Sequence, residues 1–273
     1  MLASGSAGNA TLVSDGTCRV LIDAGLSYRE LTRRLQPLDV DPAAVDAVFI
    51  THAHGDHTRG AGLLSRRHGV PVHATAAVRS EWGAADIAVW RTLRPGRART
   101  VGNLRFVPFA IPHDAAAIGF RVETAEGAIG YATDVGALTP PIAARLRDCR
   151  VLVIESNHAA ELLRVSPYAR ATRERIASAE GHLSNEALAD FVRDELADSV
   201  RCIVLAHVSR VNNLPELAEM TCREALRAAG RRDADVDVLV ARQDRPTRTI
   251  DLGAWPAAPA PPPSRAQQVA LPF

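Results

Sequence analysis

Three histidines and one aspartate lie within six residues, at positions 52–57. The histidines are His52, His54 and His57, and the carboxylate is Asp56. Imidazole nitrogens combined with a carboxylate suit a borderline divalent ion such as zinc, and they also accept manganese or iron. On an extended segment His52 and His54 point the same way, whereas Asp56 and His57 follow a turn and reach a second point nearby. The spacing therefore predicts two ions side by side rather than a loop of solvated histidines.

Further candidate ligands follow strand signals elsewhere in the chain. The cluster itself comes after residues 46–50, an apolar and β-branched run that predicts a buried strand. Three more candidates stand at the ends of predicted strands, namely His113, Asp134 and His207. Strand ends are where the loops of an α/β scaffold meet and where its sites commonly lie. A two-ion site needs more ligands than one loop supplies, so we expect these side chains to join the cluster.

The order of strand and helix signals predicts how these residues are positioned. Strands are predicted at residues 9–13, 19–23, 46–50, 70–74, 104–109, 118–123, 128–132, 151–154, 201–206, 236–241 and 247–252. Helices are predicted from Ser27, near residues 61–68, after Pro141 to about Arg147, over residues 157–180 with a break at Pro167, after a cap at Ser184 or Asn185, and from Pro215. Residues 82–103 are expected to hold loops and one short strand. Strands come first in each half and helices later, which predicts two sheets packed face to face between helical layers.

Composition indicates one folded domain followed by a tail. The chain has 273 residues, 47% of them hydrophobic and 23% charged, as in ordinary globular proteins. We expect residues 1–253 to fold and residues 254–273 to form a disordered tail, because only alanine and proline occur between residues 256 and 263.

Charge and cysteine usage indicate which partners and which cellular compartment to expect. A net charge of +1 gives no general attraction to nucleic acid, although local arginine clusters, including Arg164, Arg170, Arg173 and Arg175, permit a polyanionic substrate. Four scattered cysteines without a Cys-x-x-Cys pair predict reduced core residues. We find neither a signal peptide nor an apolar run long enough to span a bilayer, so we expect no membrane partner and a cytoplasmic protein.

Taken in chain order, the candidate ligands resemble the ligand series of the metallo-β-lactamase superfamily. The series is His52, His54, Asp56, His57, His113, Asp134 and His207. The resemblance spans residues 4–252 and implies a four-layer αββα sandwich with a dinuclear site at one edge. It further implies that a first ion is bound by His52, His54 and His113, that a second is bound by Asp56, His57 and His207, and that Asp134 bridges the two.

Other motifs resemble the WalJ/YycJ-type hydrolases within this superfamily. They are Ser4-Gly5-Ser6-Ala7-Gly8-Asn9, Pro112-His113-Asp114-Ala115, Thr133-Asp134-Val135-Gly136, Glu155-Ser156-Asn157-His158, Gly181-His182-Leu183-Ser184-Asn185, and His207-Val208-Ser209 followed by Asn212-Asn213. That group is linked to 5′→3′ exonuclease activity on DNA, so the expected substrate is nucleic acid, with DNA favoured over RNA. The chain departs from the group at Ala159, where an aspartate is usual. It also begins almost at the first motif, so we expect a shortened first strand.

The resemblance implies hydrolysis of a phosphodiester by a hydroxide that bridges two divalent ions. Such ions lower the pKa of a bound water from about 15.7 to about 7 and neutralise charge on the phosphate. Zinc or manganese suits this ligand set, and iron is a further alternative. Asp56 is expected to be catalytic as well as a metal ligand. His182 resembles the histidine with which related nucleases protonate the leaving oxygen, and we expect Glu155 to orient it.

Five hydroxyl and amide side chains near these motifs are candidate contacts to phosphate oxygens. They are Ser184, Asn185, Ser209, Asn212 and Asn213. Residues of these types also cap helices and fix turns, so both interpretations stay open.

The last six residues of the chain resemble a peptide motif. The sequence Gln268-Val269-Ala270-Leu271-Pro272-Phe273 is similar to the Gln-aliphatic-x-Leu-x-Phe peptides by which bacterial replication and repair enzymes bind the sliding clamp. Gln268, Leu271 and Phe273 are the expected anchors, and an extended tether suits a peptide that binds in a groove. The alternative is a tail without a partner.

Two other functions fit parts of the pattern. A hydrolase of a thioester, lactone or β-lactam would keep the fold and the ions, but those relatives lack the Gly-His-Leu-Ser-Asn and His-Val-Ser motifs. A non-catalytic binding protein on the same fold is disfavoured by the complete ligand set, because a disused site usually loses ligands. The sequence therefore favours a dinuclear, metal-dependent 5′→3′ DNA exonuclease.

Overall fold

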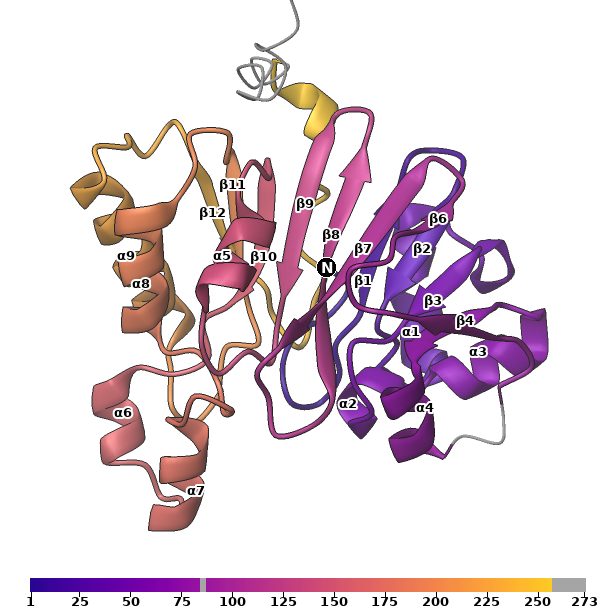
Figure 1. The fold of residues 1–273 in the computed structure, drawn as a ribbon, viewed down its shortest axis with the longest axis horizontal. Helices are drawn as coiled ribbons and strands as arrows, with labels where there is room; N and C mark the ends of the chain where they lie inside the picture. Colours follow the sequence, from indigo (N-terminus) through magenta and orange to yellow (C-terminus); the bar gives the residue numbers. More distant parts are fainter. Residues whose placement is uncertain (84–86, 257–273) are drawn as a thin grey trace, which may run out of the picture.

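Two mixed sheets lie face to face in the computed structural model, which describes residues 1–83 and 87–256 (Figure 1). The first sheet has the order β1-β2-β3-β4-β5, with β1 Thr11–Ser14, β2 Arg19–Ile22, β3 Ala47–Phe49, β4 Val72–Thr75 and β5 Trp90–Leu93. The second has the order β12-β11-β10-β9-β8-β7-β6, with β6 Arg99–Val101, β7 Leu104–Ile111, β8 Ala117–Thr124, β9 Gly127–Ala132, β10 Val151–Glu155, β11 Cys202–Ala206 and β12 Asp237–Val240. Strands β2 to β5 are parallel, as are β9 to β12.

Alternate residues of each strand enter different layers of the core. On β3, Phe49 faces the second sheet, whereas Val48 faces the helices outside the first sheet. On β10, Val153 faces the first sheet and Leu152 faces the opposite helices. Successive side chains of a strand point to opposite faces, so strands buried on both sides are apolar throughout. Phe49 anchors the middle layer, with its ring 4.1 Å from that of Phe106.

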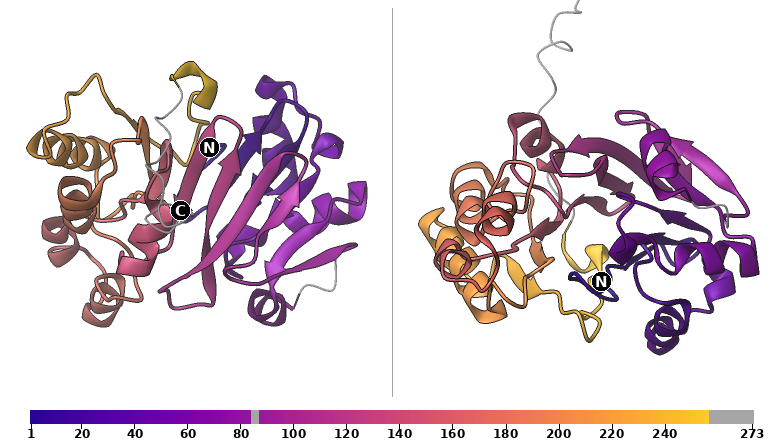
Figure 2. Two further views of the ribbon diagram at one scale, coloured as in Figure 1. Left: turned by 45° about the horizontal axis from the view of Figure 1, so that its top comes forward. Right: turned by 90° about the horizontal axis from the view of Figure 1, so that it is seen from below.

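Helices cover the outer face of each sheet, which gives the predicted αββα sandwich. The α-helices are α1 Tyr28–Leu35, α2 Gly55–Thr58, α3 Ala61–His68, α4 Ala76–Trp82, α5 Pro140–Leu146, α6 Ala160–Arg164, α7 Arg170–Ile176, α8 Asn185–Glu195 and α9 Pro215–Ala228, and the 3₁₀ helices are Gln36–Leu38, Pro42–Ala44 and Leu252–Ala254. Helices α1, α3 and α4 share a core with the first sheet, and α5, α8 and α9 share one with the second. Figure 2 shows these two groups on opposite sides of the molecule.

Local sequence signals account for most element boundaries. The Ser27 hydroxyl caps α1 by accepting from the Glu30 N–H at 3.2 Å, and the Ser184 hydroxyl caps α8 by accepting from the Ala187 N–H at 3.1 Å. Pro215 occupies the first turn of α9, where its missing N–H costs nothing. These predicted boundaries are confirmed. At the start of the chain, Ala3 and Ala10 form a single antiparallel bridge.

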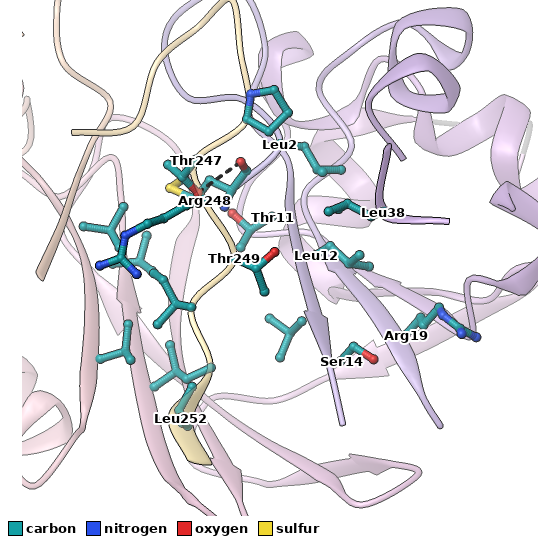
Figure 3. Close-up of a pocket in the computed structure, with 18 of the residues that line it drawn as sticks. Leu2, Thr11, Leu12, Ser14, Arg19, Leu38, Thr247, Arg248, Thr249 and Leu252 are labelled. Atoms are coloured by element: carbon teal, nitrogen blue, oxygen red, sulfur yellow. Dashed lines mark hydrogen bonds between the residues drawn. The ribbon is translucent and has the colours of Figure 1, made fainter. Parts of the chain in front are cut away.

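Two predictions about strands were wrong. Residues 82–103 contain two strands, β5 and β6, rather than one. Strand β5 pairs with β4 of the first sheet, and β6 pairs with β7 of the second sheet across a turn. Residues 247–252 form no strand. They line a cavity of about 370 Å³ together with residues of β1, and the Thr247 N–H donates to the carbonyl oxygen of Met1 at 2.9 Å rather than to a strand. Figure 3 shows Leu12 and Ser14 on one side of this cavity and Thr247 and Leu252 on the other.

The end of the chain stays a matter of prediction. The tail anchors Gln268, Leu271 and Phe273 lie outside the described residues.

Within residues 1–83 and 87–256, none of the helices combines the length and the apolar character that crossing a membrane requires.

Candidate metal centre

All seven predicted ligands meet at one edge of the sandwich. Each lies in the loop or turn that follows a strand: β3 for residues 52–57, β7 for His113, β9 for Asp134 and β11 for His207. The carboxyl ends of parallel strands open onto the same side of a sheet, and ligands bind there in open α/β folds. Candidate ligands that are far apart in the sequence thus lie in a single cluster in space.

His52, His54 and His113 form a first group of side chains. Their ligand nitrogens all lie within 4.8 Å of one another. His52 Nε2 is 3.1 Å from His54 Nδ1. The Nδ1–H of His113 donates to the carbonyl oxygen of Gly181 at 3.2 Å, which turns Nε2 of the same ring toward the group. A hydrogen bond of this kind from the outer nitrogen is typical of metal-binding histidines.

Asp56, His57 and His207 form a second group, also within 4.8 Å. Asp56 Oδ2 lies 3.5 Å from His57 Nε2 and 3.9 Å from His207 Nε2. The single turn of α2 carries Asp56 and His57 away from His54, so the two groups come from one loop but point to different places.

Asp134 lies between the two groups. Its carboxylate stands within 4.8 Å of ligand atoms of His52 and His57, and it forms another set with Glu155, His182 and His207. Asp134 Oδ2 is 3.3 Å from His57 Nε2, and Oδ1 is 3.2 Å from His207 Nδ1. This is the position expected of a carboxylate shared by two ions.

Asp23 is a buried partner of the site that the sequence analysis missed. Its carboxylate accepts from the Thr51 N–H at 2.9 Å and lies 2.7 Å from His57 Nδ1. It therefore fixes the imidazole so that Nε2 faces the second group. Asp23 directly follows β2, as Asp134 follows β9, so the same strand-end signal was present in the sequence.

Glu155 connects the second group to His182. One oxygen, Oε1, accepts from Nδ1 of His182 at 2.9 Å and from Nδ1 of His207 at 2.8 Å. Both rings therefore direct Nε2 away from Glu155. His207 Nε2 turns toward Asp56, and the His182 side chain keeps 14% of its surface exposed.

The unpartnered atoms and the electrostatics of the site fit divalent cations. Among the described residues, His207 Nε2 is buried without a hydrogen-bond partner, which costs about 1–3 kcal/mol. His113 Nε2 and Asp134 Oδ2 also make no well-aligned hydrogen bond, although Asp114 Oδ1 and His57 Nε2 lie 3.1 Å and 3.3 Å from them. Burial disfavours charge on His207, yet the carboxylates of Asp134 and Glu155 raise its pKa to about 9. Burial likewise opposes charge on His57, but Asp23 and Asp134 raise its pKa well above the usual value. The carboxylates around His57 and His207 thus stabilise positive charge in this part of the site, whether it is carried by a proton or by a metal cation.

The backbone around the cluster is strained and closely packed. Asp23, Asp134 and His207 have φ values of 59°, 56° and 52°, in the left-handed region that costs ordinary residues about 1–2 kcal/mol. Gly25 allows another close approach, because a Cβ there would meet the Asp56 carbonyl oxygen at 1.6 Å. Strain at strand ends that carry ligands is common in functional sites.

The five candidate phosphate contacts differ in their surroundings. The Ser184 hydroxyl caps α8, and the Ser209 hydroxyl accepts from the N–H groups of Val211 and Asn212. Asn185 and Asn213 are almost fully buried and bond to each other at 2.9 Å. Asn212 is also buried. Because the amides of Asn185 and Asn213 bond to each other inside the protein, the structural interpretation is the better one for these two, whereas Asn212 Oδ1 is buried without a hydrogen-bond partner.

Comparisons with known proteins agree with this geometry. A family model described as "Beta-lactamase superfamily domain" matches residues 18–208. Exodeoxyribonuclease WalJ of Streptococcus pneumoniae is 35% identical over 228 residues, which cover 81% of this chain and 85% of the relative. Exodeoxyribonuclease YycJ of Bacillus anthracis is 30% identical, over 84% of this chain and 89% of the relative. The metallo-β-lactamase fold protein YhfI of Bacillus subtilis matches in structure with a TM-score of 0.67 and 16% identity, over 89% of this chain and 95% of that one.

Removing the charge of Asp23 is expected to weaken metal binding. Asp23→Asn keeps an oxygen for the Thr51 N–H but takes away the carboxylate that holds His57 Nδ1. Loss of such a partner typically lowers metal affinity by about 10–100-fold. Zinc affinity would be measured by competition with a chromophoric chelator. The control is Asp46→Asn, an exposed aspartate that accepts from the Arg19 N–H far from the cluster. Equal zinc affinity in the two variants would contradict the role given to Asp23.

Proposed function

Because this chain belongs to the β-lactamase superfamily and has the metallo-β-lactamase fold, we propose that it is a dinuclear metal-dependent phosphodiesterase that degrades DNA from the 5′ end. The observation that carries this proposal is the combined set of seven ligand side chains and the Glu155–His182 pair at one edge of the sandwich. The likeness to two proteins named exodeoxyribonucleases, over more than four fifths of the chain, supports DNA as the substrate.

We infer two divalent ions, zinc or manganese, with iron as an alternative. The first would be held by His52, His54 and His113, the second by Asp56, His57 and His207, with Asp134 between them. When bound, such a pair supplies hydroxide at neutral pH and neutralises charge on a phosphate oxygen.

Asp56 is suited to handle the proton of the attacking water. Its carboxylate is only partly buried, and Oδ2 is held by the Asn9 amide at 3.3 Å. Burial raises the pKa of a carboxyl group, but the neighbouring imidazoles of His57 and His207 lower that of Asp56. Asp56 therefore stays ionised and can accept a hydrogen bond from water that enters the site.

His182 is suited to protonate the leaving 3′ oxygen. The Nδ1–H donates to Glu155, which leaves Nε2 free to carry a proton toward the open side of the site. Burial lowers the pKa of His182, but the Glu155 carboxylate outweighs that effect and raises it. A histidine held in this way delivers a proton without reorganising, and general acid catalysis contributes about 10²–10⁴-fold to rate.

We place the protein in the cytoplasm. All four cysteines are free thiols buried in the core, as expected in a reducing compartment. A partner in that compartment would be the sliding clamp, bound through Gln268, Leu271 and Phe273.

The central experiment tests which bond is cleaved. Protein loaded with zinc or manganese is incubated with 5′-labelled duplex DNA, single-stranded DNA and RNA, and with a thioester. We expect labelled nucleotides to be released from DNA, faster than from RNA. His54→Ala and Asp134→Ala should reduce turnover to the level of chelator-treated protein, because each removes a ligand.

Two results would count against the proposal. Turnover of the thioester without turnover of any nucleic acid would identify the alternative hydrolase. DNA turnover that survives both substitutions would mean that chemistry occurs elsewhere. A protein that binds DNA but turns over none of these substrates would be the non-catalytic alternative.

His182→Ala is expected to lower kcat for DNA by about 10²–10⁴-fold. A phosphodiester with a nitrophenolate leaving group needs no proton on departure, so its kcat should fall much less. The control is His68→Ala, whose ring bonds to Tyr28 at 2.7 Å away from the site. Equal losses on both substrates would show that His182 has a structural rather than an acid role.

Deleting residues 264–273 is expected to abolish binding to an immobilised sliding clamp while leaving hydrolysis of short DNA unchanged. Leu271→Ala with Phe273→Ala should have the same effect, because these side chains would fill the groove. Surface plasmon resonance measures the interaction. Absence of binding by the full chain, or binding that survives the deletion, would reject the motif.

A further inference from the structure

One arginine of the segment that holds α6 and α7 differs from the others. Arg164 and Arg170 each form an ion pair on their own helix, at 3.0 Å and 2.7 Å. Arg173 donates to two backbone carbonyls of the same segment, at 2.8 Å and 3.5 Å. Arg175 instead bonds through Nη1 to Asp114, in the loop that follows β7. Of these four arginines, Arg175 alone is connected to the metal centre by a side chain.

Asp114 brings the guanidinium group close to the first ligand group. Its Oδ2 pairs with Arg175, while its Oδ1 lies 3.1 Å from His113 Nε2 and 4.0 Å from His54 Nε2. The guanidinium of Arg175 is therefore separated from two candidate metal ligands by the width of one carboxylate. A phosphate held at the centre would bring its neighbours along the strand within reach of this cation.

The backbone that carries Arg175 is fixed relative to the site. A Cβ on Gly136, two residues after Asp134, would meet the carbonyl oxygen of Ala179 at 2.2 Å. A Cβ on Gly181, beside His182, would meet the carbonyl oxygen of Arg175 at 2.1 Å. The end of α7 thus packs directly on the loops that hold a ligand and the proposed acid, at the lower end of the molecule in Figure 1. Contacts this close leave little freedom for α7 to move away.

The side chain of Arg175 still has donors to offer. About half of it, 52%, is exposed, and its Nε and Nη2 make no hydrogen bond with any other described residue. A guanidinium is a planar fork whose paired N–H groups match two oxygens of a phosphate. The ion pair of Arg175 and Asp114 carries no net charge. We therefore expect Arg175 to hydrogen-bond a phosphate that is already in place rather than to attract DNA from a distance.

We propose that Arg175 binds the DNA phosphate adjacent to the scissile one, with Asp114 holding the guanidinium at the mouth of the site. The inference rests on the proposed function and adds a residue that aligns the strand for cleavage. Asp114 is then a positioning residue that acts through Arg175. The sequence placed Arg175 in an arginine cluster and Asp114 in the Pro-His-Asp-Ala motif, and the contact between them gives each its proposed role.

Steady-state kinetics on a short 5′-phosphorylated DNA tests the proposal. Arg175→Ala should raise KM about tenfold, the usual effect of losing a hydrogen bond to a charged group, with kcat within about a factor of two. Arg175→Lys should fall between, because a lysine keeps the charge but not the fork. Asp114→Asn should raise KM less than Arg175→Ala. The control is Arg170→Ala, which removes an exposed arginine of the same helix whose ion pair within the described part of the chain is with Glu174.

Two further measurements separate a phosphate contact from a general structural effect. Losing one phosphate contact should reduce the slope of log KM against log salt concentration by at most about 0.7–0.9, because Asp114 offsets part of the charge of Arg175. A DNA with one uncharged methylphosphonate beside the scissile phosphate should raise KM for the wild type but not further for Arg175→Ala. Metal content and the thermal midpoint, measured alongside, should match the wild type.

The outcomes distinguish this inference from the function on which it rests. A wild type that cleaves no nucleic acid would overturn the proposed function and this inference together. An active wild type in which Arg175→Ala keeps the KM and salt slope of Arg170→Ala would overturn the Arg175 assignment alone. The Arg175 assignment would also be rejected if the methylphosphonate raised KM by the same factor in the wild type and in Arg175→Ala.

Discussion

The candidate metal centre depends on one buried carboxylate, that of Glu155 at the end of β10. It accepts hydrogen bonds from the imidazoles of His182 and His207 and from the backbone N–H groups of Val135 and Leu183. A carboxylate without solvent is costly unless it is paired as completely as this one. Its partners come from the loop after β9, from the end of β11 and from the turn before α8. A single side chain therefore joins three segments of the site, and a shift of any one segment would remove part of the hydrogen bonding that this buried charge needs.

The rest of the fold provides the rigidity that this arrangement needs. Asp23, Asp134 and His207 have a left-handed backbone, which costs an L-residue up to about 1–2 kcal/mol and less for aspartate, whose short side chain can hydrogen-bond locally. Each of these residues follows, directly or by one position, a strand whose side chains are buried on both faces. A strand held between two packed layers cannot relax at its end without disturbing the core. The apolar layers thus keep the ligands in positions that the local backbone would not choose.

The sequence predicted the fold class and the set of clustered side chains because both depend on local patterns. Strands buried on two faces are apolar throughout, and His52 to His57 carry their chemistry within one loop. Prediction failed where the outcome depends on distant pairing. The run 247–252 has strand composition, but it lines a cavity together with residues of β1. For Asn185 and Asn213 the sequence left two interpretations open, and only the packing of two distant segments shows that these amides bond to each other in the interior. Asp23 was overlooked because a single carboxylate after a strand gives no sign of the histidine it will meet.

The buried carboxylates are distributed unevenly over the two ligand groups. In the second group, His57 is backed by Asp23 and His207 by Glu155, each through Nδ1. In the first group, the Nδ1–H of His113 meets only the carbonyl oxygen of Gly181. A carboxylate behind an imidazole raises its basicity more than a carbonyl does, so it strengthens the bond from the other nitrogen to a cation. The second group is accordingly the half of the candidate centre whose imidazoles are backed by carboxylates. The first group, which includes the exposed His54 and lies beside Asp114, is the half that opens toward solvent.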